Sequence, residues 1–399
     1  MPAVSSPSPR AADDRCPGAL RAHQAADGLL VRVRIPGGRL TTAQLGRLAE
    51  VSRRDGTGLL ELTSRGNVQV RGIADPDGVD RVAAALAGAG LLPSVTHERV
   101  RNIVASPLSG LDGGGDADVR PLVAAVDAAL CAAGDLARLS GRFLIALDDG
   151  RGDVTALGAD LCWTAGTGAL LLAGRDVGLR ARADEVADVV VAAARAFLGH
   201  RGERRDVWRV ADLPDVAPAI VAALGGAHAD PVDPPRGGPP PVGPHPGDVV
   251  VAAAPLGRLS AAQADTVAAL ADGTVVVTPW RTVVVGGPPA STMPRLAGAG
   301  LVVDPASPWI GVTACTGRPG CGSARADVHA DAAEVLAAAG PPPAGALPLH
   351  WAGCDRCCGR PAAPAALLVA DGSGYRVESP RGEHDGPLSE RVAHARRAT

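Results

Sequence analysis

The stretch PGGRLTTAQLGRLAEVSRRDGTGLLELTSRGNVQVRGI (36–73) has a counterpart in PLGRLSAAQADTVAALADGTVVVTPWRTVVVGG (255–287). Both contain Gly-Arg-Leu, a Ser or Thr, a Gln-containing amphipathic helix, Asp-Gly, a strand that ends at Thr, an Arg and a second strand. Arg65 and Arg281 fall at corresponding places in this comparison. A shared order of elements over about 35 residues indicates duplication of a small α+β module.

Helix signals in both stretches support this interpretation. Thr41 or Thr42 in the first stretch and Ser260 in the second are the expected N-caps, because a hydroxyl oxygen can accept from the first free N–H groups of a helix. The sequence therefore predicts one helix over a small sheet, formed twice and paired by pseudo-two-fold symmetry.

Composition narrows the class of protein. The chain has 399 residues, of which 46% are hydrophobic but only 2% aromatic, so Ala, Val and Leu must fill its cores. All 39 basic residues are arginine, and the net charge of -3 does not indicate nucleic-acid binding. The start MPAVSSPSPRAADDR lacks the apolar region of a signal peptide, and no apolar run reaches the ~18 residues of a membrane span. We expect a cytoplasmic protein that acts on neither membranes nor nucleic acids.

Proline- and glycine-rich segments divide the chain. The predicted parts are a disordered tail (1–15), a first half-domain (16–94), a first α/β domain (95–224), a Pro/Gly-rich linker (225–247), a second half-domain (248–303), a second α/β domain (304–378) and a disordered tail (379–399). Apolar spacing predicts helices over 119–134, 181–199 and 322–339.

Five of the eight cysteines lie within residues 315–358, and this crowding needs a cause. The first pair, in TACTGRPGC, has a C-x5-C spacing, and the second is either C-x2-C or C-x3-C within HWAGCDRCCGRP (350–361). A five-residue gap is too wide for a zinc knuckle and suits a loop around a bulkier [4Fe–4S] cluster. Zinc remains the alternative metal, and chance crowding the alternative to any metal.

The order C-x5-C, about thirty residues, then G-C-x3-C resembles the cluster motif of the sulfite and nitrite reductase family. That resemblance implies a duplicated α+β architecture with two ferredoxin-like half-domains, each followed by an α/β domain that binds the cluster or a tetrapyrrole. It implies four cluster ligands: Cys315, Cys321, Cys354 and Cys358. Cys357 stands where the family usually has a small residue and is then a neighbour of the cluster; the alternative is that it replaces one of the four as a ligand.

Arginine motifs extend the resemblance. The chain has RVRIPGG, TSRGNVQVRG and Arg-Asn-Ile, which are similar to the family's motifs that bind tetrapyrrole carboxylates and the substrate anion. Rigid, permanently charged donors suit a macrocycle edged with carboxylates. The resemblance implies seven tetrapyrrole-binding residues: Arg32, Arg34, Arg65, Asn67, Gln69, Arg101 and Arg142. The alternative interpretation of the strand arginines is an ordinary solvent-facing position.

One departure separates the chain from the reductases. They place two lysines in a Lys-x-Lys strand over the anion, whereas GRFLIALDDG offers Arg142 and then Leu144. Loss of that second charge disfavours anion reduction. The chain is more similar to the precorrin-3B synthase branch, in CPGAL and DGLLVRVRIPGG (16–38), in its F-x-x-A-x-D-D-G strand (143–150) and in TPWR (278–281).

This branch implies an O2-dependent monooxygenase of aerobic cobalamin biosynthesis, which hydroxylates precorrin-3A at C20 and forms a γ-lactone. The implied cofactors are a [4Fe–4S] cluster and a mononuclear non-haem iron, with NADH-derived electrons from a separate reductase or ferredoxin. A siroheme-dependent ferredoxin–nitrite or sulfite reductase is the alternative. His329 and His350 are candidate iron ligands because they are near the cysteines in sequence, and a structural role is the alternative for each.

Overall fold

The computed structural model describes residues 14–225, 227–361, 364–380, 382 and 384–397. The chain divides into two compact units. The six-stranded unit comprises residues 14–18, 34–37 and 93–239, and the duplicated unit comprises residues 19–33, 38–92 and 240–397. The expected N-terminal tail falls almost entirely outside the described residues.

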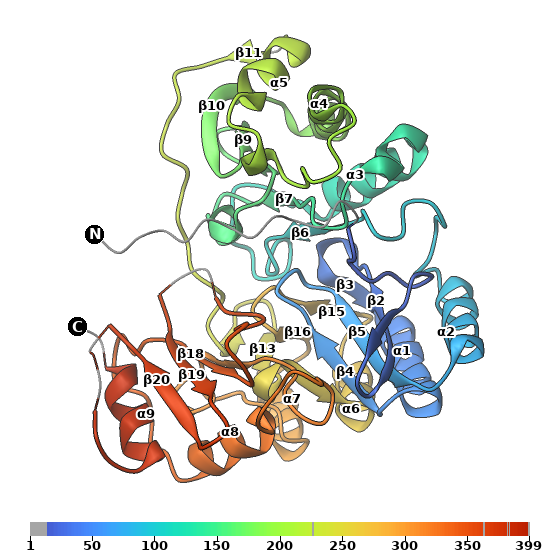
Figure 1. Ribbon diagram of the computed structural model, residues 1–399. Coiled ribbons are helices and arrows are strands. Elements are labelled where there is room, and N and C mark those ends of the chain that lie inside the picture. Colours follow the sequence, from blue (N-terminus) through green and yellow to red (C-terminus); the bar gives the residue numbers. More distant parts are fainter. Residues whose placement is uncertain (1–13, 226, 362–363, 381, 383, 398–399) are drawn as a thin grey trace. The chain divides into compact units, whose positions relative to one another are not determined.

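Two antiparallel sheets of the duplicated unit repeat one strand order (Figure 1). The first sheet runs β1 (His23–Ala25), β2 (Gly28–Val33), β5 (Val68–Ile73), β4 (Leu59–Leu62), β14 (Arg258–Ser260). The second runs β12 (Gly243–His245), β13 (Val249–Ala253), β16 (Thr282–Gly286), β15 (Thr274–Val277), β3 (Arg39–Thr41). The helices of the two repeats are α1 (Thr42–Asp55) and α2 (Pro76–Gly88), then α6 (Ala261–Leu270) and α7 (Pro289–Gly298). The predicted duplication is confirmed by this matching order.

Each repeat contributes one strand to the sheet of the other. β14 pairs with β4 and places Arg258 opposite Glu61, while β3 pairs with β15 and places Arg39 opposite Val276. Helices α1 and α6 pack against each other. The exchange covers one edge of each sheet with the other repeat, which hydrogen-bonds backbone groups that would otherwise face solvent.

The predicted helix caps are confirmed. Thr41 and Ser260 accept from the backbone N–H groups of Gln44 and Gln263, each at 3.1 Å. Each glutamine side chain accepts in return from the backbone N–H of its cap residue, which completes two capping boxes.

A third, four-stranded sheet follows the second repeat. It runs β17 (Val312–Ala314), β18 (Leu349–Ala352), β19 (Ala366–Ala370), β20 (Tyr375–Glu378), and its helices are α8 (Val328–Ala337) and α9 (Leu388–Arg396). The first three strands are parallel. Helix α9 buries Val392 and Ala395, so the prediction of a disordered tail over 379–399 is wrong for this helix. Its apolar residues are few and separated by charges, so the sequence alone gave a weak helical signal.

The six-stranded unit has one mixed sheet. Its order is β11 (Ala227–His228), β10 (Arg175–Arg180), β9 (Ala169–Leu172), β8 (Leu161–Thr164), β7 (Ile145–Asp148), β6 (Ile103–Ala105), and its helices are α3 (Arg120–Ala132), α4 (Val186–Arg201) and α5 (Val216–Leu224). The predicted helices over 119–134 and 181–199 correspond to α3 and α4. The expected linker 225–247 contains two short strands, β11 and β12, whose partners lie outside it.

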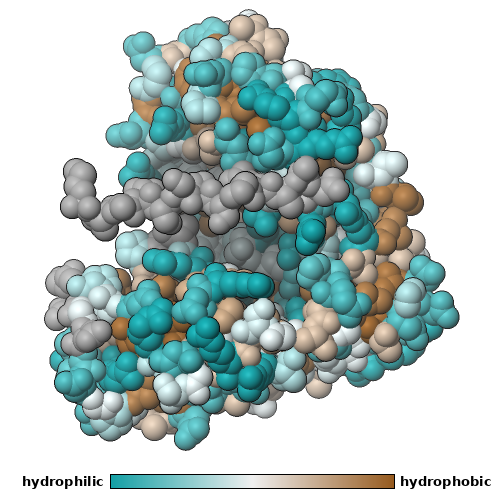
Figure 2. Space-filling view, in the orientation of Figure 1, coloured by the Kyte–Doolittle hydropathy of each residue, from teal (hydrophilic) through white to brown (hydrophobic). Residues whose placement is uncertain are grey.

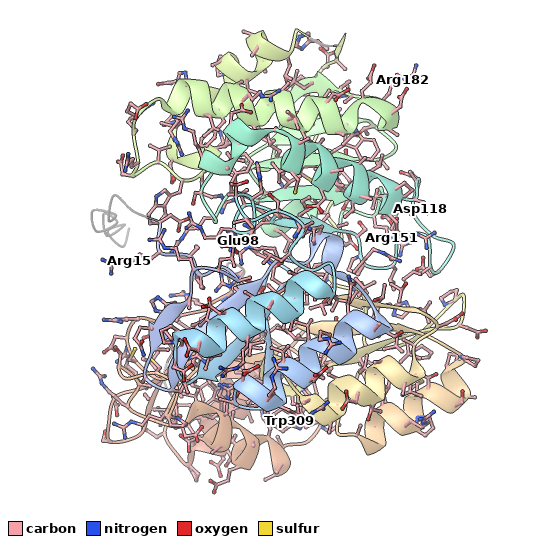
Figure 3. The ribbon with its side chains drawn as sticks, turned by 90° about the vertical axis from the view of Figure 1, so that its right-hand side faces the viewer. Arg15, Glu98, Asp118, Arg151, Arg182 and Trp309 are labelled. Carbon is pink, nitrogen blue, oxygen red and sulfur yellow. The ribbon has the colours of Figure 1, made fainter. Side chains whose placement is uncertain are left out.

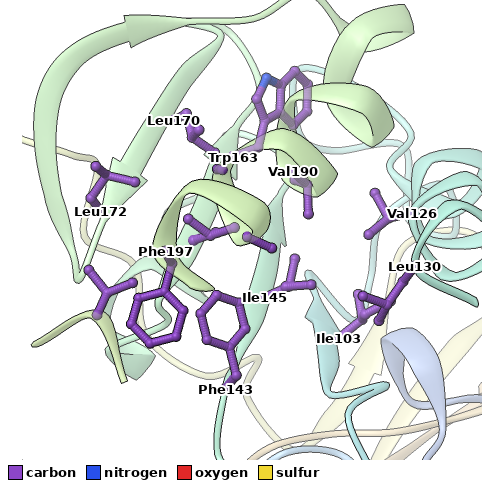
Figure 4. Packing of buried hydrophobic residues seen from close by; sticks show 14 of the residues in the cluster. Ile103, Val126, Leu130, Phe143, Ile145, Trp163, Leu170, Leu172, Val190 and Phe197 are labelled. Carbon is purple, nitrogen blue, oxygen red and sulfur yellow. The ribbon is translucent and has the colours of Figure 1, made fainter. Parts of the chain in front are cut away.

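The core of the six-stranded unit lies between this sheet and its helices (Figure 4). The rings of Phe143 and Phe197 lie 5.3 Å apart, and Trp163 and Val190 belong to the same buried cluster, with Trp163 4% exposed. Most other core positions are Ala, Val, Leu or Ile, as the low aromatic content requires.

Hydrophilic side chains predominate on the face seen in Figure 2, with smaller hydrophobic areas between them. Among the described residues, the exposed large hydrophobic side chains are Leu20, Val95 and Val232. No helix in the described part of the chain combines the length and apolar character needed to cross a membrane.

Candidate functional site

A pocket of about 330 Å³ opens in the duplicated unit. Strands β2, β4 and β5 of the first repeat form one wall, and β14 with the turn before β16 extends it from the second repeat. The cysteine loops that follow β17 and β18 contribute the other wall. Its polar and thiol lining comprises Arg32, Glu61, Thr63, Ser64, Gln69, Arg71, Arg258, Arg281, Cys315, Thr316, His329 and Cys358.

The topology brings together the four cysteines predicted as ligands. Because β17 and β18 are parallel neighbours, their carboxyl ends meet at one edge of the sheet, where Cys315 follows β17 and Cys354 and Cys358 follow β18. Cys315 interacts electrostatically with Cys321 and Cys358, and Cys358 also interacts with Cys321 and Cys354. The structure thus gathers the four thiols, while their ligation of a cluster stays a prediction.

Burial and the neighbouring thiols raise the pKa of Cys358. Burial also raises the pKa of Cys315, although the backbone N–H groups of Gly353 and Gly317 act in the opposite direction. The Gly353 N–H lies 3.1 Å from the Cys315 sulfur. Such N–H groups stabilise a thiolate, which is the form that binds metal. A cation bound among the thiols would reverse the unfavourable effect of their mutual proximity.

The backbone around these thiols is closely packed. A Cβ at Gly353 would lie 2.8 Å from the Ala324 Cβ, and one at Gly317 would lie 2.6 Å from a methyl carbon of Val328. Glycine therefore lets the two loops approach each other. Four thiols from two loops, with N–H donors beside them, fit the ligand set of a [4Fe–4S] cluster.

A site for one metal ion needs ligands that converge on one point, which the ligands of a [4Fe–4S] cluster do not need. Within the described ranges, no three His, Cys, Asp or Glu side chains are grouped as the ligands of one metal ion would be. The thiolates of a cubane each bind a separate iron, so they need not converge on one point. The ligands of the implied mononuclear iron remain unassigned.

Cys357 has a different environment from the four gathered thiols. It packs against the hydrophobic cluster of Ala352, Leu367 and Val369. Its backbone adopts the left-handed conformation, with φ 45°. This packing agrees with the expectation that Cys357 is a neighbour of the cluster and not a ligand.

The loop after Cys321 corrects one prediction. A helix was expected over 322–339, but α8 begins only at Val328. Turns precede it, in which Cys321 N–H donates to the Gly317 carbonyl and Arg325 N–H to the Gly353 carbonyl. Asp327 then caps the helix by accepting from its first N–H groups. Residues 322–327 therefore form turns that contact the second cysteine loop, although their sequence pattern predicts a helix.

The two candidate histidines support the cysteine loops. His329 Nε2–H donates to the Cys315 carbonyl at 2.9 Å, and His350 Nε2–H donates to the Cys358 carbonyl at 3.1 Å. Burial lowers the pKa of both to about 4, with Arg258 contributing at His329 and Arg281 at His350. Both rings are therefore neutral near pH 7, and each holds the carbonyl of a predicted ligand.

Glu61 contacts three other polar residues of the pocket wall. It accepts from Arg258 at 3.0 Å and from the Gln69 amide at 3.1 Å, and it lies 3.8 Å from Arg71. Gln69 in turn accepts from Arg32 at 2.5 and 2.9 Å. These contacts connect Arg32, Gln69, Glu61 and Arg258 in one row across β2, β5, β4 and β14.

Two arginines link this wall to the first cysteine loop. Arg258 donates to the Thr316 carbonyl at 3.1 Å, and Arg71 donates to the Gly320 carbonyl at 2.9 Å. Arg71 is 7% exposed and also forms an ion pair with Asp27 at 2.9 Å, so it is not the solvent-facing residue of the alternative interpretation. Glu61 and Arg258 were missed from the sequence because their contact depends on the exchanged strand β14.

The seven predicted tetrapyrrole residues are divided between the units. Arg32 and Gln69 line the pocket, and Arg65 and Asn67 belong to the β4–β5 turn of the same unit. The other three lie in the six-stranded unit: Arg34, Arg101 and Arg142.

The arginines of the six-stranded unit have protein partners. Arg34 donates to the Arg99 carbonyl at 3.1 Å, and Arg101 forms an ion pair with Asp127 at 2.7 Å. Arg142 lies over the Trp208 ring at 4.8 Å. Leu144 is buried at 3% exposure, so its alkyl side chain contributes to packing.

Asp148, the last residue of β7, and Asp149 hold the loop that follows this strand. Asp148 accepts from the backbone N–H groups of Gly150, Gly152 and Val154. Arg151, labelled in Figure 3, forms an ion pair with Asp112 at 2.6 Å. The D-D-G motif thus closes a tight turn, as two aspartates followed by glycine favour. The carboxylates of Asp148 and Asp149 are nevertheless fully buried, so the expectation that they face solvent is wrong.

The chain is similar to two related groups of known proteins, the nitrite/sulfite reductases and precorrin-3B synthase. Residues 21–89 match the family model of the nitrite/sulfite reductase ferredoxin-like half domain. The chain is 28% identical over 391 residues to a precorrin-3B synthase from Sinorhizobium sp, which covers 90% of this chain and 81% of that protein.

Shorter matches lead to nitrite reductases. A ferredoxin–nitrite reductase of Synechococcus elongatus is 36% identical over 132 residues, or 31% of this chain and 25% of that one. The chloroplastic enzyme of Arabidopsis thaliana is 37% identical over 94 residues, or 23% and 16%. A solved structure of the Mycobacterium tuberculosis NirA protein has a TM-score of 0.66 at 20% identity, and it covers 88% of this chain and 74% of that one. The likeness to NirA establishes the α+β fold. The recognition expected from the motifs is confirmed: the chain carries a nitrite/sulfite reductase ferredoxin-like half domain and, along 90% of its length, resembles precorrin-3B synthase.

Proposed function

We propose that the chain is a precorrin-3B synthase, which uses O2 and two electrons to hydroxylate precorrin-3A at C20 and to close a γ-lactone from the ring A acetate. One oxygen atom enters the product and the other leaves as water, with electrons that originate from NADH and arrive through a separate reductase or ferredoxin. The observation that carries the proposal is a pocket whose wall combines arginines with Cys315 and Cys358.

Cys315, Cys321, Cys354 and Cys358 would hold the [4Fe–4S] cluster. When bound, the cluster supplies single electrons next to the pocket. His329 and His350 fix the carbonyls of two of these residues, and the glycines keep the loops close. The chain thereby contributes a rigid frame that needs little rearrangement during turnover.

The pocket arginines would orient the macrocycle. Gln69 fixes Arg32, and Glu61 fixes Arg258, so both guanidinium groups are held in defined positions. A rigid fork matches the two oxygens of a carboxylate, and the substrate carries acetate and propionate groups around its edge. The further contacts that the resemblance implies are Arg34, Arg65, Asn67, Arg101 and Arg142.

The architecture supports a finer domain assignment. The second repeat has the strand order of the first, whose residues 21–89 match the half-domain family. We therefore assign residues 248–303 to a second ferredoxin-like half-domain and residues 304–378 to the cluster domain.

A siroheme-dependent nitrite or sulfite reductase is the second candidate. The short matches to nitrite reductases have higher identities, 36% and 37%, than the long match to the synthase. Leu144 disfavours the reductase candidate, because an alkyl side chain cannot stabilise a bound anion as lysine does.

The test is anaerobic purification followed by iron, sulfide and EPR analysis, and then incubation with precorrin-3A, O2 and a reductant. We expect a reduced-cluster EPR signal and a product one oxygen atom heavier by mass spectrometry, with no such product without O2. Cys354→Ser should lose the cluster signal. Zinc without sulfide would contradict the cluster assignment, and a strong siroheme band with nitrite consumption would favour the reductase.

A further inference from the structure

The turn between β15 and β16 contains an arginine in an unusual backbone conformation. Arg281 has φ 60°, in the left-handed region that residues with a side chain rarely adopt. Its N–H donates to the Thr278 carbonyl, and Thr278 N–H donates to the Thr282 carbonyl. The buried hydroxyls of Thr278 and Thr282, 2.6 Å apart, fix the turn from inside.

The first repeat forms the same turn with glycine. Gly66 has φ 64°, its N–H donates to the Thr63 carbonyl, and Thr63 N–H donates to the Asn67 carbonyl. Matching these bonds aligns Arg281 with Gly66, so the expected correspondence of Arg281 with Arg65 is wrong by one position. The second repeat therefore places a long cationic side chain where the turn itself requires only glycine.

The Arg281 side chain packs directly against Gly257 and lines the pocket. A Cβ on Gly257 would lie 2.3 Å from the Arg281 Cδ, so only glycine leaves room for it. One terminal nitrogen lies 3.7 Å from the Cβ position of Gly359, the residue after Cys358. The guanidinium group thus lies beside the second cysteine loop in the pocket wall.

Arg281 also differs from the other pocket arginines in its partners. Arg32 donates to the side-chain oxygen of Gln69. In the same way, Arg71 donates to Asp27, and Arg258 donates to Glu61. Arg281 makes no side-chain hydrogen bond or salt bridge with any residue that the structure describes. Burial lowers its pKa, and the charge of Glu61 only partly opposes this effect. A half-buried cation without a hydrogen-bonded counterion favours an anionic ligand.

We propose that Arg281 binds a carboxylate of the tetrapyrrole substrate, on the side of the pocket next to Cys358. This inference rests on the proposed function, which supplies a substrate edged with carboxylates. Arg281 then fixes one edge of the macrocycle against the cysteine loop, while Arg32 and Arg258 serve the wall of the first sheet.

The decisive variant is Arg281→Gly, which gives the second turn the residue of the first. It should fold at least as stably as the parent, because glycine adopts this backbone conformation without strain. Anaerobic titration with precorrin-3A should show Kd increased about 10- to 100-fold, since a charge-assisted bidentate contact is lost. Iron, sulfide and the EPR signal should stay at parent levels.

Asp248→Gly is the matched control. Asp248 also has a left-handed backbone, with φ 53°, but is exposed in the turn before β13. It should gain stability in the same way and keep the parent Kd. Arg281→Gln, which removes the charge but keeps a long polar side chain, should weaken binding like Arg281→Gly.

The outcomes separate this inference from the proposed function. If the parent binds precorrin-3A and both Arg281 variants bind it equally well, the inference is overturned and the proposed function stands. If the parent does not bind precorrin-3A, the proposed function fails. If both variants lose the cluster together with binding, Arg281 supports the cysteine loop only, and its assignment to substrate is overturned.

Discussion

Replacement of Asp153 by asparagine should stabilise the six-stranded unit at high pH and leave it unchanged at low pH. Asp153 is 5% exposed and accepts from the Ser106 hydroxyl at 2.6 Å. Burial raises its pKa to about 7, and the nearby charges of Asp148 and Asp149 add to the increase. Ser106 and Arg151 act in the opposite direction but do not offset burial.

The magnitude follows from the two pKa values. The reference value of an unfolded aspartate is 3.8, so folding raises the pKa by about three units, and each unit corresponds to about 1.4 kcal/mol. The folded state binds the proton more tightly, so the protonated acid is favourable below pH 4. This stability is lost as pH rises from about 4 to about 7. Above pH 7, ionised Asp153 costs about 4 kcal/mol, which the uncharged Asp153→Asn side chain avoids while it can still accept from Ser106.

Hydrogen exchange of peptides from β7 and β8 measures this effect in the intact protein. Between pH 5 and pH 8, the difference in opening free energy between Asp153→Asn and the parent should grow by about 2.6 kcal/mol, or about 80-fold in the opening equilibrium. Ser106→Ala is a useful comparison, because it removes the hydrogen bond but not the buried carboxyl. A difference that stays constant over this pH range, or an Asp153→Asn variant that is less stable at pH 8, would refute the reasoning.

Three further predictions concern the duplicated unit. Cys357→Ser should keep its full iron and sulfide content while Cys358→Ser loses most of it, and equal losses by chemical analysis would contradict the assignment of Cys357 as a neighbour. Thr41→Ala and Ser260→Ala should each lower the free energy of unfolding by about 1 kcal/mol in urea titrations, because each removes one capping box; an unchanged midpoint for either would mean that its cap contributes nothing. Glu61→Gln should lower the free energy of unfolding by about 2 kcal/mol, because Arg258 loses its counterion and Arg71 keeps only Asp27 in a largely buried wall; no change would show that solvent screens the network.

The sequence was most informative where the signal is local. The capping residues of α1 and α6, the order of elements in both repeats and the gathering of four thiols after β17 and β18 all follow from short motifs and spacing. These features depend on neighbours within a few residues, or on the rule that parallel strands end at one edge.

Nonlocal contacts account for what the sequence did not predict. The contact between Arg258 and Glu61 joins residues 197 positions apart through a strand of three residues, which has no recognisable pattern of its own. Helix α8 begins late because the preceding segment bonds to the second cysteine loop. The alignment of Arg281 with Gly66 depends on a backbone conformation and a hydrogen-bond pattern that residue identity alone does not reveal.

The two sheets of the duplicated unit can be compared position by position, which shows what the fold itself requires of the residues in the pocket wall. In the first sheet, one row across the strands reads Arg32, Gln69, Glu61, Arg258. In the second sheet, the corresponding row reads Val251, Val284, Val276, Arg39, and its three valines are at most 2% exposed. Three valines therefore satisfy the packing needs of this scaffold, and a charged row at the same positions costs desolvation that valine avoids. The first repeat keeps its charged row beside the cysteine loops, and the second adds Arg281 to that same pocket in place of glycine. Both departures from the simpler residue lie in one pocket, and the proposed binding of an anionic substrate there would account for them.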